Sequence, residues 1–265
     1  ARRDQRRRRR IHPPGGRRVD VSPRLTAATA RRILQQLRHD RRTLGLIFGL
    51  PTVLMGLLAL MLIDQPGAFD AWGPPILGIF PLIVMFLVTS VATLRERTSG
   101  TLERLLSLPI GRGDIVGGYA LAFSLLGTAQ AIVVSLFAFG LYGLDIPGSP
   151  LLVAAVAIVD ALLGTALGLA ASSVATTEFQ AVQMMPLLLF PQLFLCGLLL
   201  PREDLPPVLE WLSWLMPLSY AMDATTEATI HDSVTSAYLV NIAVVLAFSA
   251  GALVVGGITL RRQTR

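Results

Sequence analysis

The sequence contains no lysine, and all 23 of its basic residues are arginines. A P-loop of the G-x-x-x-x-G-K-[ST] type needs its lysine to reach the nucleotide phosphates. This sequence therefore contains no P-loop of that type. If ATP drives its activity, a partner subunit must bind the ATP and Mg²⁺, and we expect no cofactor in this chain.

Cysteine and histidine are almost absent. Cys196, the single cysteine, lies in an apolar run, and His12, His39 and His231 are scattered along the chain. One cysteine cannot form an intrachain disulfide, and the spacing of the histidines predicts no metal site. G-x-S-x-G and H-E-x-x-H motifs are absent as well. We therefore predict no catalytic residues and no enzymatic activity of the chain itself.

Charged residues make up 15% of the chain and hydrophobic residues 53%, whereas a soluble domain carries about 25% charged residues. The apolar residues form blocks of about twenty, the length of a helix that crosses a bilayer. They predict an all-α membrane protein with six transmembrane helices within residues 43–262. The six blocks are Thr43–Ile63, Pro74–Leu94, Gly118–Leu141, Leu151–Val174, Ala181–Leu200 and Tyr238–Leu260.

The N-terminal region divides into two parts. Residues 1–21 are rich in arginine, proline and glycine and hold too few apolar residues to fold. Such a tract can bind nucleic acid, but a disordered cytoplasmic tail attracted to anionic membrane lipid is the simpler interpretation, and we expect no nucleic-acid partner. Residues 22–42 are predicted to form an amphipathic interfacial helix, with Ser22 as N-cap and Pro23 at the first helical position.

The arginines predict the orientation of the spans in the membrane. Fifteen precede the first block, four follow the second block and three follow the sixth, whereas the loops after the first and third blocks have none. Only Arg202 lies in the loop after the fifth block. Because arginine and lysine concentrate in cytoplasmic loops, we expect both termini on the cytoplasmic side of the inner or plasma membrane.

The cytoplasmic segment at residues 95–110 is predicted to form a short helix across the membrane face. Leu102, Leu105 and Leu106 make one apolar edge, and Pro109 is a stop signal. Asp114 is predicted to cap the third spanning helix. The apolar edge is consistent with a docking site for a partner protein and equally with an ordinary loop held against the bundle.

Two sequence motifs resemble those of ABC-2 type transporter permeases. RERTSGTLERLLSLPIGRGDIVGGY resembles the family motif E-x-x-x-G-T-L-E-x-L-L-x-x-P-I-x-R-x-[ED]-I, with Asp114 where the family often has Glu. GLLLP at Gly197–Pro201, followed by LPP at Leu205–Pro207 and by MPLSY at Met216–Tyr220, resembles the family's segment after the fifth span. The resemblance extends over about residues 25–262 and leaves out the arginine-rich tail.

The resemblance implies partners for this chain. In this family two permeases, identical or related, pair above two ATPase subunits, and the segment between spans two and three sits in a groove of the ATPase. The resemblance implies an ATPase-coupling role for Glu96, Gly100, Thr101, Leu102, Glu103, Leu105, Leu106, Pro109 and Arg112. It implies a short re-entrant outer segment that caps the substrate route and includes Pro201, Pro206, Trp211, Pro217 and Tyr220.

The motifs also resemble those of daunorubicin-type drug exporters. That similarity implies export of an amphipathic, drug-like or lipid-like substrate, with ATP hydrolysed by the partner. An exporter of lipid, glycan or lipid-linked cell-envelope material is the alternative. An ion-coupled secondary transporter fits less well, because the sequence has one carboxylate within a span and no visible inverted repeat.

Asp160 is that carboxylate, and it lies midway along the fourth block. Because a charge at this depth is costly, it should face protein or water. Gly164 and Gly168 share its helical face and form a G-x-x-x-G pair typical of close helix packing. Gln130, at similar depth in the third block, is a plausible neighbour. We expect either a structural, hydrogen-bonded aspartic acid or a role in handling substrate or protons. Polar residues at the start of the fifth block are expected to be solvated: Glu178, Gln180 and Gln183.

Overall fold

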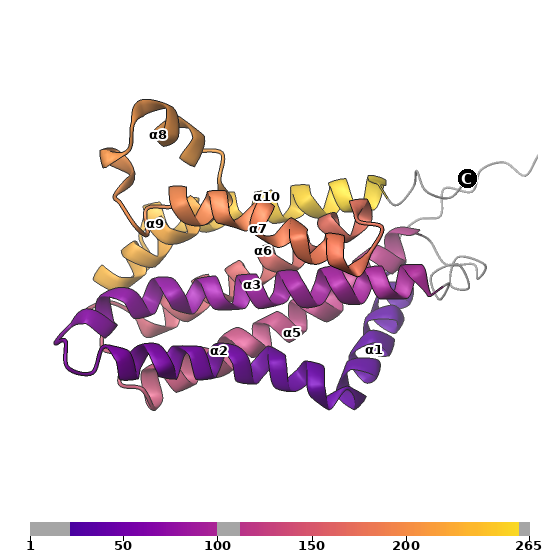
Figure 1. Cartoon of the computed structure of the whole chain (residues 1–265), viewed down its shortest axis with the longest axis horizontal. Helices are drawn as coiled ribbons and strands as arrows, with labels where there is room; N and C mark the ends of the chain where they lie inside the picture. Colours follow the sequence, from indigo (N-terminus) through magenta and orange to yellow (C-terminus); the bar gives the residue numbers. More distant parts are fainter. Residues whose placement is uncertain (1–21, 100–111, 260–265) are drawn as a thin grey trace, which may run out of the picture.

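The computed structural model describes residues 22–99 and 112–259, and within these ranges every regular element is a helix. Figure 1 shows long helices lying side by side, with a smaller helical group at one end. The predicted all-α class is confirmed for the described residues. The helices are α1 Pro23–His39, α2 Arg41–Met61, α3 Ala68–Thr98, α5 Arg112–Gly140, α6 Pro150–Val174, α7 Glu178–Leu195, η1 Arg202–Asp204, α8 Pro207–Ser213, α9 Pro217–Ile230 and α10 Ser236–Thr259.

Five of the described helices are long and apolar enough to cross a membrane: α2, α3, α5, α6 and α10. The predicted fifth span is the exception: α7 has 18 residues and is about 27 Å long, which is enough for a short span, but its polar residues make it less apolar than the other five helices. The prediction carried this span to Leu200, but the helix ends at Leu195 and Gly197 adopts a left-handed conformation with φ of 92°. Polar residues Glu178, Gln180 and Gln183 occupy its first two turns.

The second span is longer than its apolar block. α3 has 31 residues and continues through Arg95, Glu96 and Arg97 to Thr98. The prediction placed these three residues in a separate cytoplasmic helix starting at Arg95. They instead extend the spanning helix by about one turn, and they can do so because no glycine or proline lies between Pro81 and Ser99.

The amphipathic helix α1 crosses the ends of the long helices, at the opposite end of the molecule from α8 (Figure 1). Ser22 is its N-cap residue and a proline follows in the first turn, as predicted. Ala30 and Ile33 are buried against the part of α5 that carries Tyr119 and Phe123. The apolar face of α1 is therefore partly covered by protein rather than left for lipid.

The tightest helix pair is α3 with α6. A side chain at Gly164 would collide with the carbonyl oxygen of Leu82, and one at Gly168 would come within 2.6 Å of the carbonyl oxygen of Phe86. These contacts confirm the close-packing role predicted for the glycine pair.

Candidate functional site

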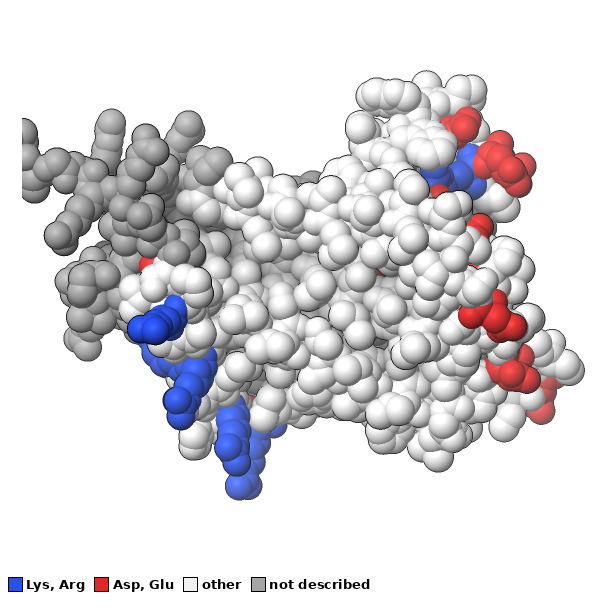
Figure 2. Space-filling view, turned by 180° about the vertical axis from the view of Figure 1, so that it is seen from behind, with Lys and Arg blue, Asp and Glu red and all other residues white. Residues whose placement is uncertain are grey.

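Charge divides the molecule into two ends. Figure 2 shows arginine side chains gathered mainly at the end that carries α1, and acidic side chains mainly at the other end. The second end holds the turn after α2, the loop after α5 and the segment from η1 to α9 (Figure 1). The arginine-rich end is also where α3 ends and α5 begins, on either side of residues 100–111.

Three side chains link the helices at the arginine-rich end. Arg32 of α1 donates a hydrogen bond of 2.8 Å to Glu96 of α3, and the hydroxyl of Tyr119 on α5 donates to the same carboxylate. The Glu96 side chain is only 22% exposed. Glu96 therefore joins three helices within the chain, and its predicted contact with an ATPase stays a prediction.

The two arginines on either side of Glu96 contact the connection between α6 and α7. Arg95 donates two hydrogen bonds of 3.0 Å to the carboxylate of Glu178, the first residue of α7. Arg97 donates to the carbonyl oxygens of Ser172 and Ser173 at 2.7 and 3.1 Å, and also to that of Ala175. Glu178 was expected to be a solvated residue; its side chain is exposed, and it also forms an ion pair with Arg95.

Asp114 ties the start of α5 to the start of α1. Its carboxylate accepts hydrogen bonds from the Ser22 amide at 2.6 Å and from the Thr26 hydroxyl at 3.1 Å, and the residue is fully buried. Asp114 was expected to precede and cap the third spanning helix. It lies within the first turn of α5 and bonds to α1, because the helix already begins at Arg112.

Most of the predicted coupling residues lie outside the described part of the chain: Gly100, Thr101, Leu102, Glu103, Leu105, Leu106 and Pro109. Arg112 is the first residue of α5. The described residues that flank this segment, from Arg95 to Arg97 and at Asp114, are all bound to other helices. The two ends of the coupling segment are thus held by α1, α5, α6 and α7.

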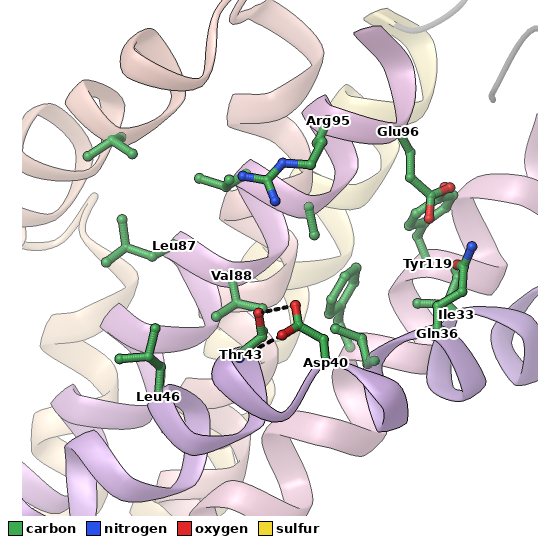
Figure 3. A pocket seen from close by; sticks show the side chains of 15 residues that line it. Ile33, Gln36, Asp40, Thr43, Leu46, Leu87, Val88, Arg95, Glu96 and Tyr119 are labelled. Carbon is green, nitrogen blue, oxygen red and sulfur yellow. Dashed lines mark hydrogen bonds between the residues drawn. The ribbon is translucent and has the colours of Figure 1, made fainter. Parts of the chain in front are cut away.

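A cavity of about 570 Å³ opens among α1, α2, α3 and α5 near the arginine-rich end. Figure 3 shows Leu46, Leu87 and Val88 on one side of it and Glu96 and Tyr119 on the other. The lining of the cavity therefore combines apolar side chains with charged and hydroxyl groups, which suits an amphipathic molecule.

The lining of this cavity also includes the N-cap residue of α2. Asp40 accepts hydrogen bonds from the hydroxyl and the amide of Thr43 at 2.6 and 3.1 Å (Figure 3). These bonds hold the pKa of the Asp40 carboxyl below its usual range. Asp40 therefore presents a carboxylate at neutral pH in the lining of the cavity, to which Arg95 also belongs.

The polar residues predicted inside the bundle are both buried. Asp160 is 1% exposed, and its carboxylate is directed at Gly78 of α3, where a side chain would collide with it. Gln130 is fully buried, and neither its amide nitrogen nor its amide oxygen has a hydrogen-bond partner among the described residues. One carboxylate oxygen of Asp160 also lacks a partner there. The structure therefore supplies no hydrogen bond for the expected pairing of these two residues.

The outer segment after α7 is ordered around Arg202. Its guanidinium lies 4.2 Å from the ring centre of Trp214 and forms a 2.5 Å ion pair with Asp223. Burial raises the pKa of Asp223, and the charge of Arg202 opposes that shift. The Tyr220 hydroxyl donates to the carbonyl oxygen of Trp214 at 2.8 Å. Arg202 and Tyr220 therefore hold this segment against α9.

The remaining residues predicted for the outer segment lie at its helix ends. Pro201 and Pro206 are the N-cap residues of η1 and α8, Trp211 is an exposed residue of α8, and Pro217 starts α9. α8 and α9 have 7 and 14 residues, too few to cross a bilayer. The amide of Leu218 in the first turn of α9 contacts the side-chain oxygen of the buried Gln192 on α7 at 3.4 Å.

Sequence reasoning missed several contacts at the arginine-rich end. Arg32, Tyr119 and Arg97 had no assigned role, although Arg97 lies within the recognised motif. The partners of Arg97 are backbone carbonyls, which leave no mark in the side-chain sequence. Among the described residues, no group of three or more His, Cys, Asp or Glu side chains is placed to hold a metal ion.

Comparison with known proteins identifies relatives of this chain. Residues 23–230 match the ABC-2 type transporter family. A 162-residue stretch is 30% identical to the "Probable multidrug ABC transporter permease YbhR" of Escherichia coli, covering 60% of this chain and 44% of that protein. YbhS of the same organism is 23% identical to this chain over a stretch that covers 72% of this chain and 50% of YbhS.

A third relative is the "Linearmycin resistance permease protein LnrN" of Bacillus subtilis. It is 27% identical over 178 residues, which cover 65% of this chain and 45% of LnrN. The matched part of the chain thus spans half or less of the length of these curated relatives. The family match alone covers most of this chain, including the motif at residues 96–115 and the outer segment up to α9. The chain therefore belongs to the ABC-2 type transporter family, as a multi-pass membrane permease.

Proposed function

We propose that this chain forms the transmembrane route of an ATP-driven exporter whose ATP is hydrolysed by separate subunits. The observation that carries the proposal is the family match over residues 23–230 in a sequence without lysine. An ABC transporter permease implies an ATPase partner, and a sequence without a P-loop lysine cannot supply the ATPase itself. Two ATPase subunits and a second permease, identical or related, would complete the complex.

The proposed coupling site is the segment at residues 96–112, together with the helix ends that hold it. Movement of this segment would be transmitted directly to α3, because α3 continues as one helix to Thr98. Glu96 and Asp114 would pass the movement to α1, since each accepts hydrogen bonds from that helix. This arrangement supports a role for the segment in converting ATPase closure into movement of the spans.

The proposed topology has six spans, with α7 as the fifth, and both termini in the cytoplasm. α7, at about 27 Å, is slightly shorter than the roughly 30 Å hydrocarbon core. Local thinning of the bilayer accommodates such a mismatch at modest cost. The concentration of arginine at the end that carries α1 supports the orientation (Figure 2).

The proposed substrate is an amphipathic, drug-like or lipid-like molecule. The cavity near the arginine-rich end supports this class, because it combines apolar Leu46, Leu87 and Val88 with polar Asp40 and Glu96. The names of the relatives YbhR and LnrN refer to multidrug transport and to linearmycin resistance. The outer segment around Arg202 would close the route on the far side.

Copurification and transport test the proposal together. Tagged permease from its own host, purified in mild detergent, should bring an ABC-type ATPase with it, identified by mass spectrometry. Inside-out vesicles with both proteins should accumulate an amphipathic fluorescent dye when ATP is added. A partner whose catalytic glutamate is replaced by glutamine is the control and should support no uptake. Purification without any ATPase, together with ATP-independent uptake, would contradict the proposal.

A further inference from the structure

The connection between α6 and α7 is held from two sides by the end of α3. This connection, the α6–α7 turn, comprises residues 172–178, from the last residues of α6 to the first residue of α7. Arg97 binds carbonyl oxygens at its beginning, and Arg95 binds Glu178 at its end. Both arginines belong to α3 and are two residues apart.

The contacts of Arg97 match what a helix C-terminus needs. The last carbonyl groups of a helix have no partner within it, and they carry the negative end of the helix dipole. Arg97 places one guanidinium against the carbonyl oxygens of Ser172, Ser173 and Ala175. Hydrogen bonds from a charged donor are about twice as strong as neutral ones. Ser172, Ser173 and Ala175 are buried, so water competes little for these bonds.

The contact of Arg95 is weaker. The Arg95 and Glu178 side chains are 66% and 49% exposed, and exposed ion pairs contribute little to stability. Their two parallel hydrogen bonds still fix the direction in which α7 leaves the turn. Arg97 is therefore the main attachment and Arg95 an accessory one.

An apolar contact lies beside the two arginines. Leu94 of α3, Ala175 of the turn and Ala181 of α7 are buried together in one small cluster. The rest of α3 is already packed closely on α6 through Gly164 and Gly168. The end of α3, the turn and the start of α7 are thus joined by charge-assisted bonds and by a buried apolar contact.

We propose that Arg97 is a positioning residue that makes the α6–α7 turn move with the end of α3 during the transport cycle. This inference rests on the proposed function, because the movement comes from the segment at residues 100–111 that follows α3. Movement of that segment then reaches α7 as well as α3. Without Arg97, α3 moves alone, and ATP hydrolysis is less tightly linked to transport.

Hydrogen–deuterium exchange on the purified permease in lipid nanodiscs tests the attachment without any ATPase. Arg97→Gln should speed amide exchange in residues 172–181 by about fivefold or more, because the last turn of α6 loses its charged partner. Arg97→Lys keeps the charge but not the forked geometry and should give an intermediate rate. Arg38→Gln, at an exposed arginine of α1, is the matched control and should change nothing in these residues.

Transport per ATP hydrolysed, measured in proteoliposomes with the ATPase, tests the positioning role. With Arg97→Gln, transport per ATP hydrolysed should fall about fivefold or more, measured only in complexes that retain the ATPase. If Arg97 only stabilised the fold, Arg97→Gln would lower the yield of folded protein and leave transport per ATP at the wild-type value. That result would overturn the proposal.

A cross-link tests whether the end of α3 and the α6–α7 turn stay together throughout the transport cycle or must separate during it. Arg97→Cys and Thr176→Cys, at an exposed residue of the turn, can be joined by a short bifunctional thiol reagent on a Cys196→Ala background. The joined protein should regain wild-type transport per ATP, whereas an inactive joined protein would show that the contact opens and that the proposal is wrong. Amide exchange in residues 172–181 at the wild-type rate in Arg97→Gln would also overturn the proposal.

Absence of any ATPase from the wild-type complex would instead contradict the proposed function. The exchange result would still decide whether Arg97 holds the turn.

Discussion

Gly164 of α6 lies directly against the backbone carbonyl of Leu82 on α3, at a place where no side chain fits. Four residues later, Gly168 lies in the same way against Phe86. Two glycines one turn apart thus let the backbones of α3 and α6 touch, which is the main source of close packing available to helices surrounded by lipid.

Gly164→Ala should therefore destabilise the permease by about 1–3 kcal/mol, because the added methyl group forces the two backbones apart. The measurement is unfolding of the purified protein in detergent. Gly251→Ala on α10 is the matched control, since a side chain there meets nothing within 4 Å. Alanine favours a helix over glycine by up to about 1 kcal/mol, so this control should be neutral or slightly stabilised. Equal losses in both variants would contradict the account of the α3–α6 contact.

Asp160 provides the second prediction. Its carboxylate is directed at Gly78 and is buried within the bundle. Asp160→Asn preserves the size of the side chain, so a structural role predicts normal assembly and near-normal transport. Gly78→Ala would push against the same carboxylate and should lower the stability of the protein, measured by thermal unfolding. If Asp160→Asn assembles normally but abolishes transport, Asp160 acts on substrate or protons instead.

Labelling of single cysteines in intact cells tests the topology. On a Cys196→Ala background, cysteines at Asp64 and Asp232 should react with an impermeant thiol reagent, because both positions are exposed at the acidic end. A cysteine at Arg38, exposed at the arginine-rich end, should react only after the cells are opened. Reaction at Arg38 from outside would reverse the proposed orientation.

The parts of the fold that sequence predicts well are those with a periodic signal. Apolar blocks located α2, α3, α5, α6 and α10, and the spacing of Gly164 and Gly168 predicted the contact face of α6. The length of α7 was overestimated, because Leu198 to Leu200 are apolar but lie beyond Gly197, where the backbone leaves the helix. Hydropathy alone does not distinguish an apolar helix from an apolar turn.

The candidate site was predictable only in part. The motif pointed to the segment at residues 96–112, but not to the partners of the residues that flank it. Glu96 and Asp114 contact α1 from positions more than sixty residues away in the sequence. Such long-range pairs depend on how the helices pack, so a single sequence does not specify them. The assignment of Leu102, Leu105 and Leu106 to a docking edge stays a prediction.

The most direct test of the central claim is the double change Leu102→Ser with Leu105→Ser. Burying a leucine side chain is worth about 1.5–3 kcal/mol, so the loss of two should weaken ATPase binding about tenfold or more. Replacing Arg6 to Arg10 together with alanine is the control and should leave binding unchanged. The double mutant should be inserted and folded, and quantitative copurification should show that it releases its ATPase. A transport assay should show that it no longer transports in the presence of ATP. A double mutant that retains its ATPase at the wild-type ratio and transports normally would contradict the account.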